Sequence, residues 1–303
     1  MTAVRRHWPV GFLLAIIAVA SVAAEPRVLI VREESAVAQQ TAEMLARELS
    51  AAGWAVAEVT ATDDPSVAGR AEGEQAVVAL GARAFGSAVR RARGKPIVSA
   101  LLTRGSFDDI ASGSRERSSA ILLDQPIDRW IDLINATFPG VKRVGMLTGP
   151  AGQRAAAAVE RRLVERGMTL SIERIAKLED VVPAIEHLVP RMDVLLAMPD
   201  PLAHNRNTVQ PLLLTTYRAG IPVVAYSESY QHAGAVVALY STIPQIVAQI
   251  VDSVRQIRDG TTLPNVQAPR DFTVGINTAV ARSLGLSLPP AADIKERLRS
   301  LGQ

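Results

Sequence analysis

The sequence predicts an α/β protein whose two successive halves each contain a mainly parallel β-sheet. Short apolar runs alternate with amphipathic stretches along the chain, which is the pattern of strands joined by crossover helices. This rhythm repeats in the second half, so two α/β units of similar size follow one another. Alanine is abundant and aromatic residues make up only 4% of the chain, which favours an α/β protein over a β-sandwich.

Five strands are predicted in the first half of the chain. They are short apolar runs at residues 27–31, 54–60, 76–80, 96–102 and 120–123. A helix is predicted over residues 36–52, because Val37, Met44, Leu45 and Leu49 form one apolar stripe and Gly53 can end it. Strands that alternate with helices predict a parallel sheet with right-handed crossovers.

The second half is predicted to repeat this arrangement. The expected helices span residues 127–138, 151–166, 181–188 and 205–219, and the expected strands span residues 143–147, 170–175, 194–198 and 221–226. Pro139-Gly140 and Gly167 provide helix stops. No sequence repeat is visible at a fixed period, so any duplication is architectural.

The C-terminal region is less regular. A strand at residues 235–240, a helix at 243–258, a strand at 271–277 and a short helix at 278–284 are predicted. Pro289-Pro290 is predicted to end regular structure before a charged last segment. These elements are too few for a third domain, so they are expected to complete both earlier sheets, and the chain is expected to cross between the lobes more than once.

Residues 4–24 have the pattern of a secretory signal. Arg5 and Arg6 precede an apolar run over residues 10–22, and small residues at 21–24 offer a cleavage site. The run is shorter than the roughly 20 residues that span a bilayer. We therefore predict that residues 1–24 are a signal peptide; a retained membrane anchor is the alternative. Export favours binding, sensing or hydrolysis outside the membrane over ATP-driven cytosolic chemistry.

The charge and cysteine content narrow the function further. The 303 residues contain 33 Lys and Arg against 30 Asp and Glu, and removal of Arg5 and Arg6 with the signal leaves 31 basic residues. A nearly neutral protein lacks the excess positive charge that is typical of proteins that bind nucleic acid or an anionic membrane. With no cysteine the chain can form no disulfide and carries no lipid-anchor residue, so a soluble exported protein is expected.

An ordered set of segments between Phe138 and Pro290 resembles a known family. The segments are Phe138-Pro139-Gly140 with residues 141–147, then 193–200, 219–225, Glu228, Tyr230, 233–235, 269–272, 276–277 and 284–290. In order and spacing they are similar to the periplasmic substrate-binding components of ABC transporters, of the tryptophan/tyrosine type. No single motif is diagnostic, and the likeness is strongest from Phe138 onward.

The resemblance implies a type I periplasmic-binding fold, with two Rossmann-like lobes joined by a three-crossing hinge. It implies an N-terminal lobe of residues 25–124 plus 236–270 and a C-terminal lobe of residues 125–235 plus 271–303. It also implies a periplasmic, monomeric protein without a cofactor. The implied partners are a small-molecule ligand, held between the lobes, and an ABC permease in the inner membrane, on which the closed form docks.

Three segments depart from the family pattern. Residues 102–105 stand where relatives commonly have a Thr-Asp-Pro-type turn, and residues 118–121 stand where Asn-Val-Thr-Gly is often found. Residues 198–201 replace Pro-Thr-Asp-Asn and keep only Asp200. These are cleft-facing loops in the family, so the identity of the ligand is not carried over.

Candidate ligand-binding residues follow the carboxyl ends of the predicted strands, where open parallel sheets bind their ligands. In the first half they are Arg32, Glu33, Gly81, Arg83, Thr103 and Arg104. In the second half they are Thr148, Gly149, Asp200, Tyr226, Ser227 and Glu228.

Four of these candidates suit a ligand carboxylate. Gly81 and Gly149 lead into helix starts, where free N–H groups and the helix dipole favour an anion. Arg32 or Arg104 could clamp a carboxylate through two hydrogen bonds. The alternatives are that the glycines only make strand-to-helix turns and that the arginines are surface residues.

The acidic and aromatic candidates suit other parts of a ligand. Asp200 or Glu228 could pair with an amine, or could instead cap a turn and stabilise a first helical turn. Tyr226 and Tyr230 could stack on a planar group, or could only pack within their lobe.

The signatures of catalysis are missing. Residues 81–87 have the glycine spacing of a phosphate-binding loop but lack its lysine. No Gly-x-Ser-x-Gly elbow or cysteine nucleophile exists, and His187, His204 and His232 lack metal-ligand spacing. The sequence therefore predicts that the protein is not an enzyme and holds no metal or cofactor.

The leading hypothesis is a periplasmic solute-binding component of an ABC transporter. It would bind a small polar ligand, such as an amino acid or related carboxylate, by hinge closure. The alternative is an exported sensor or accessory module of the same fold that acts with a membrane receptor. An exported hydrolase is a third hypothesis, which the missing nucleophile disfavours.

Overall fold

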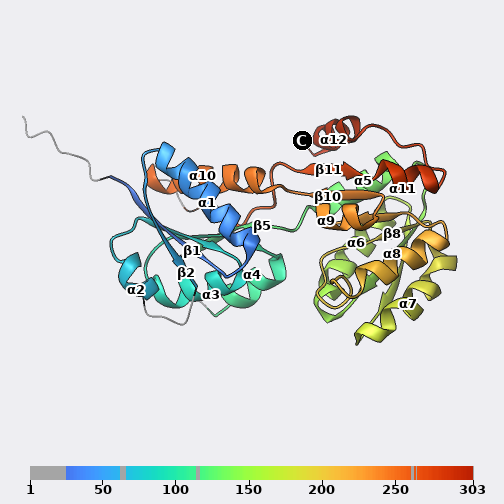
Figure 1. Cartoon of the computed structure of the whole chain (residues 1–303), viewed down its shortest axis with the longest axis horizontal. Helices are drawn as coiled ribbons and strands as arrows, with labels where there is room; N and C mark the ends of the chain where they lie inside the picture. Colours follow the sequence, from blue (N-terminus) through green and yellow to red (C-terminus); the bar gives the residue numbers. More distant parts are fainter. Residues whose placement is uncertain (1–24, 62–65, 114–116, 261–262, 264, 303) are drawn as a thin grey trace, which may run out of the picture.

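The chain forms two α/β lobes that lie side by side (Figure 1). The computed structural model describes residues 25–61, 66–113, 117–260, 263 and 265–302, so the predicted signal segment lies outside the described residues. Among the helices in these ranges, none is both long enough and apolar enough to cross a membrane.

The first lobe is built on a five-stranded parallel sheet in the order β2-β1-β3-β4-β5. The strands are β1 (Arg27–Arg32), β2 (Ala55–Thr60), β3 (Ala76–Leu80), β4 (Ile97–Leu102) and β5 (Ser118–Leu122). Side chains alternate between its faces: Val28 and Ile30 pack under α1 (Ala36–Ala51) and α10 (Ile243–Arg258). Leu29 and Val31 pack against α2 (Ser66–Ala71), α3 (Ala82–Arg91) and α4 (Arg104–Ala111).

The second lobe is built on a six-stranded sheet in the order β11-β10-β9-β8-β6-β7, in which only β11 runs antiparallel. Its strands are β6 (Arg143–Thr148), β7 (Thr169–Arg174), β8 (Val194–Leu196), β9 (Val223–Ala225), β10 (Val237–Tyr240) and β11 (Thr273–Ile276). Because helices cover both faces, the inner strands β6, β8, β9 and β10 are nearly continuous apolar runs, whereas the edge strand β7 alternates and is only partly buried.

Helices cover both faces of the second sheet. One face packs against α5 (Ile127–Thr137), α6 (Gln153–Glu165), α11 (Thr278–Ser283) and α12 (Ala291–Leu301). The other packs against α7 (Val181–Leu188), α8 (Val209–Arg218) and α9 (Glu228–Ala233). Short 3-10 turns lie at Pro150–Gly152, Leu178–Asp180 and Val189–Arg191. The predicted α/β fold with two mainly parallel sheets is confirmed.

Two expectations about the C-terminal region are wrong. The expectation that residues 236–270 belong to the first lobe fails for β10, whose Val237 and Ala238 pair with β9 in the second sheet. Regular structure does not end at Pro289-Pro290, because Pro290 precedes α12, which buries Ile294 and Leu298 against the second lobe. An apolar pair four residues apart is a helical spacing that the surrounding charges obscured.

The helix expected over residues 205–219 begins later than predicted. Residues 201–208 form turns in which Thr208 and Asn205 hydrogen-bond to each other, and α8 starts at Val209. Asn and Thr side chains compete for backbone groups in this way, which delays the helix start.

The chain crosses between the lobes three times. The crossings follow β5 at residues 123–126, follow β10 at residues 241–242, and precede β11 at residues 268–272. Before the third crossing, Gln267 pairs with Ile121 at the edge of the first sheet. The helix α10 therefore packs on the first lobe although the strands on either side of it belong to the second.

Hydrogen bonds tie the three crossings together. Gln125 Nε2 donates to Ser241 Oγ (2.9 Å), and Ser241 Oγ donates to the Asp271 carbonyl (2.8 Å). Arg129 donates to Gln125 Oε1 (2.6 Å) and to the Pro269 carbonyl (3.1 Å), which links the first crossing to the third. One connected set of polar groups thus holds all three hinge segments.

The carboxylate of Asp271 anchors the C-terminal helix to this hinge. Partial burial raises its pKa, but hydrogen bonds from the Phe272 N–H, Lys295 and Arg299 outweigh burial and bring the pKa down to about 2. Lys295 and Arg299 lie one turn apart on α12, 3.1 and 3.0 Å from Asp271 Oδ1. The last helix is therefore fastened to the third crossing.

Replacing Ser241 with alanine should lower the free energy of unfolding by about 1.5 kcal/mol, because Gln125 loses its acceptor and the Asp271 carbonyl its donor. The midpoint of urea unfolding measures the change. Ser283→Ala is the matched control: its hydroxyl makes one exposed bond to the Val280 carbonyl, so its removal should cost less than about 0.5 kcal/mol. Equal losses for the two variants would contradict a role for Ser241 in joining the crossings.

Candidate ligand-binding cleft

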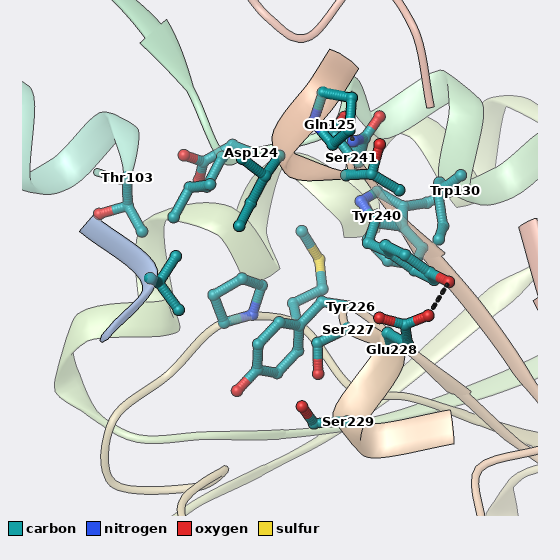
Figure 2. A pocket seen from close by; sticks show the side chains of 18 of the residues that line it. Thr103, Asp124, Gln125, Trp130, Tyr226, Ser227, Glu228, Ser229, Tyr240 and Ser241 are labelled. Carbon is teal, nitrogen blue, oxygen red and sulfur yellow. Dashed lines mark hydrogen bonds between the residues drawn. The ribbon is translucent and has the colours of Figure 1, made fainter. Parts of the chain in front are cut away.

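A cleft of about 520 Å³ lies between the lobes, beside the crossings (Figure 2). The first lobe contributes Val37, Gln40 and Thr103. The first two crossings and the start of α10 contribute Leu123, Asp124, Gln125, Ser241, Thr242, Ile243 and Pro244. The second lobe contributes Trp130, Met198, Pro199, Tyr226, Ser227, Glu228, Ser229, Leu239 and Tyr240.

The first-lobe wall depends on a bulge at the end of β4. The register of β4 against β5 shifts between Ala100 and Leu102, and Leu101 has a φ of 60°, which is unfavourable for a side chain of that size. The bulge precedes Thr103, whose Oγ1 accepts the Ser106 N–H and begins α4. Val37, predicted to lie in the core stripe of α1, is 54% exposed and lines the cleft, because it stands in the first turn of the helix, at the end of the sheet.

Asp124 follows β5 and caps α4. Its Oδ2 accepts the backbone N–H of Arg104 at 2.7 Å. Burial raises the pKa of Asp124, and the charge of Asp108 adds to this, while the Arg104 N–H and guanidinium act in the opposite direction. The pKa is raised overall because the loss of hydration on burial outweighs the stabilisation of the charged form by neighbouring groups.

Glu228 stands on the second-lobe wall, at the first position of α9. Ser227 caps this helix by accepting the Tyr230 N–H, which directs Glu228 toward the cleft. Tyr240 donates its hydroxyl to Glu228 Oε1 at 3.3 Å, as the dashed line in Figure 2 marks. Partial burial and the negative charge of Glu228 raise the pKa of Tyr240, so its phenol stays protonated.

An aromatic cluster packs behind the second-lobe wall of the cleft. The rings of Tyr226, Tyr230 and His204 make edge contacts with centroids 5.8 to 6.2 Å apart. The hydroxyl of Tyr226 donates to the His204 carbonyl, and His204 Nδ1 bonds the Tyr230 hydroxyl at 3.1 Å. Burial lowers the pKa of His204 to about 4 although Asp200 and the Leu147 carbonyl act to raise it. This histidine is neutral at physiological pH.

Trp130 adds a buried donor to the cleft lining. It comes from α5 and is 1% exposed. Its indole Nε1 has no hydrogen-bond partner within the part of the chain that the structure describes. A buried indole N–H in a native protein normally finds an acceptor.

Four of the predicted ligand-binding residues line the cleft. They are Thr103, Tyr226, Ser227 and Glu228. Eight others lie outside its lining: Arg32, Glu33, Gly81, Arg83, Arg104, Thr148, Gly149 and Asp200. Among the residues that the structure describes, no group of three or more His, Asp or Glu side chains could hold a metal ion.

Asp200 is occupied by the backbone of its own lobe. Its Oδ2 accepts the N–H groups of Gly149 (2.9 Å) and Gly152 (2.8 Å), and its Oδ1 accepts those of Leu202 (2.9 Å) and Ala203 (3.0 Å). The two glycines are needed because a Cβ on either would lie 2.8 Å from this carboxylate. The turn after β6 thus binds a carboxylate, as its sequence suggested, but this carboxylate is the side chain of Asp200 and not a ligand.

The turn after β3 also has a carboxyl group packed against its glycine. Gly81 has a φ of 102°, which favours glycine, and the carboxyl group of Glu33 fills the space that a Cβ would take. Arg32 forms an ion pair with Glu58 at 2.5 Å, and Arg83 is exposed on α3. The side chain of Arg104 lies 4.0 Å from Asp108, outside the cleft lining.

Sequence reasoning missed the cleft residues of the first two crossings, Asp124 and Gln125 after β5 and Ser241 and Thr242 after β10. The rule that ligands bind beyond the carboxyl ends of parallel strands applies to these two strands as well. Applied to β5 and β10, it would have found these residues. Trp130 carries no such signal, because it belongs to the apolar stripe of α5.

A family model described as ABC transporter substrate binding protein matches residues 77–293, more than half of the chain. The chain therefore belongs to this family. No curated protein matches it.

Solved structures show the fold of this chain. A ligand-free, open substrate-binding protein with adhesive properties from Clostridium difficile matches with a TM-score of 0.73 and 16% identity, covering 87% of this chain and 96% of that one. The ABC domain in complex with L-Trp from Streptococcus pneumoniae matches at 0.63 and 13%, covering 90% and 98%. A conserved domain protein from Vibrio cholerae matches at 0.64 and 20%, covering 89% and 98%. The chain has the type I periplasmic-binding fold.

Proposed function

We propose that this protein is the periplasmic solute-binding component of an ABC transporter. It binds a small polar ligand between its lobes and delivers it to a permease in the inner membrane. The signal pattern of residues 4–24 supports export. Family membership supports a transport component that binds rather than converts its ligand, and we propose that it acts as a monomer.

The observation that carries this proposal is a cleft with both polar and apolar lining, whose wall comes from both lobes and from the hinge. Thr103 belongs to the first lobe, Glu228 to the second, and Gln125 and Ser241 to the crossings. A ligand that contacts all of them bonds fully only when the lobes are closed. Such a ligand shifts the population toward the closed state, because it binds that state more tightly.

The sequence-based candidate for the ligand is an amino acid or related carboxylate. An ammonium group fits the cleft, since Asp124 and Glu228 can accept its hydrogen bonds. Structural neighbours bind different molecules, L-Trp in one case and D-allose in another. The ligand is therefore sought by its chemistry in a broad library.

Thermal unfolding of the purified protein against a metabolite library tests the proposal. A true ligand at about 100 times its Kd stabilises the folded state by about 2.7 kcal/mol, which raises the Tm. Small-angle X-ray scattering should then show a smaller radius of gyration when the lobes close. A library without a single stabilising compound would contradict solute binding.

A matched pair of variants locates the binding site. Ser229 and His232 are both exposed on α9, but only Ser229 lines the cleft. Ser229→Trp should fill the cleft and abolish the thermal shift, whereas His232→Trp should leave it unchanged. Equal responses of the two variants would place binding elsewhere.

A further inference from the structure

The charged side chains that line the cleft are all acidic. Among the described residues of its lining, Asp124 and Glu228 are the only carboxylates, and no lysine, arginine or histidine stands with them. Arg104, a basic candidate from the sequence, has its guanidinium 4.0 Å from Asp108, and Arg129, which donates to Gln125 Oε1, is not part of the lining. The described lining therefore carries two negative charges and no fixed positive one.

Neither carboxylate has a direct ion-pair partner in the described part of the protein, although the Arg104 guanidinium lies near enough to Asp124 to oppose the rise of its pKa. Within it, Asp124 and Glu228 form no ion pair; their hydrogen bonds come from the Arg104 backbone N–H and the Tyr240 hydroxyl. Asp200, in contrast, uses its acceptor capacity on four backbone N–H groups. Figure 2 shows Asp124 and Glu228 on different sides of the cavity, each with its carboxyl group at the wall.

Two further features point to what binds there. Trp130, Tyr226 and Tyr240 line the same cleft, and aromatic faces attract organic cations through their negative quadrupole. Independently of the carboxylates, the buried Nε1 of Trp130 is a donor without an acceptor among the described residues. A bound molecule with a neutral oxygen acceptor would satisfy it.

We infer that the ligand is an organic cation: a molecule with an ammonium group for the cleft carboxylates, a neutral hydroxyl or carbonyl oxygen for Trp130, and no carboxylate. This inference rests on the proposed solute-binding function and narrows its substrate class. A carboxylate brought into the cleft would meet two negative charges and no arginine fork. An ammonium group would instead stabilise the charged form of Asp124, which burial disfavours.

Two sets of ligands test the inference: within each set the body is constant, and either the carboxylate is replaced by a carboxamide or the amine is removed. We expect isothermal titration calorimetry to show tryptophanamide binding at least tenfold more tightly than L-tryptophan, and no binding of indole-3-propionate. Leucinamide, L-leucine and 4-methylpentanoate repeat the comparison on an aliphatic body. Within each set the carboxamide keeps the oxygen acceptor and the amine but removes the negative charge.

Variants of the two carboxylates locate the recognition. Glu228→Gln and Asp124→Asn should each weaken amine binding about tenfold and reduce the preference for carboxamide over carboxylate. Asp124→Asn keeps an oxygen that can accept the Arg104 N–H, so the start of α4 is preserved. Glu160→Gln, an exposed change on α6 outside the cleft, removes the same charge and should change neither affinity nor preference.

The outcomes separate this inference from the proposed function. If an amino acid or a plain carboxylate binds more tightly than its matched amide, or if the library ligand is an anion, the cationic class is wrong while solute binding stands. If none of the six compounds binds but the library screen finds a cation that does, the inference holds for that compound. If no compound binds at all, both proposals fall.

Discussion

Replacing Asp200 with alanine is expected to lower the free energy of unfolding by about 4 kcal/mol. The carboxylate is 4% exposed and accepts four backbone N–H groups from two turns of the second lobe. Its removal leaves four donors without a partner in a space too small to rehydrate them all. Urea unfolding followed by circular dichroism measures the loss.

Two further substitutions sharpen this test. Asp200→Asn keeps the shape but turns one acceptor oxygen into an NH2 group that faces two N–H donors, so we expect about 2 to 3 kcal/mol of destabilisation. Asp259→Ala removes an exposed carboxylate that pairs with Arg258 at the end of α10, and should cost less than about 0.5 kcal/mol. An Asp200→Asn protein as stable as the parent would mean that the four bonds do not hold the turns.

Acid should destabilise the protein through His204. Burial lowers its pKa to about 4 in the folded state, whereas a histidine in the unfolded chain titrates near 6.5. Between these values the unfolded state binds more protons, so stability rises with pH from about 4 to 6.5 and is fully present above 6.5. The difference corresponds to about 3 kcal/mol. Unfolding midpoints measured at half-unit pH steps report it.

Comparison of two histidine variants isolates this contribution from the carboxylates that titrate at lower pH. His204→Gln has no proton to bind, so the dependence of its stability on pH between about 4.5 and 6.5 should be much flatter. His187→Gln changes a histidine whose side chain is 80% exposed, and should leave the pH profile of the parent intact. If the two variants share one profile, His204 does not govern acid stability.

The strands were predictable because most of them are buried on both faces. Residues 76–80 form β3 as expected and are buried throughout, so the run AVVAL is continuous rather than alternating. Helix α10 was predicted from residue 243 to residue 258, with Asp259-Gly260 as its stop, and the structure gives the same bounds. Local patterns of this kind depend on nearby residues alone.

Local sequence patterns do not determine which sheet a strand joins. The strand at residues 237–240 and the helix after it were both recognisable, but they belong to different lobes. Their assignment depends on which sheet edge remains open when the rest of the chain is in place. That depends on the long-range pairing of β10 with β9, which no single window of sequence contains.

The cleft was only partly predictable for a related reason. Glu228 and Asp200 both follow a strand of the second lobe and are both acidic, yet Glu228 lines the cleft while Asp200 is enclosed by backbone. What separates them is the pair of glycines at 149 and 152, which lets a turn close on Asp200. The spacing of glycines in one loop decided the role of an acid 51 residues away.

The order of the elements along the chain has a consequence for biosynthesis. The core of the first lobe is completed by residues 246–254 of α10, and the core of the second by β11 and α12 beyond residue 272. Neither half can bury its apolar surface until nearly the whole polypeptide has been made. A chain emerging from the ribosome therefore cannot complete either core until synthesis is almost over, so both lobes are expected to finish folding late.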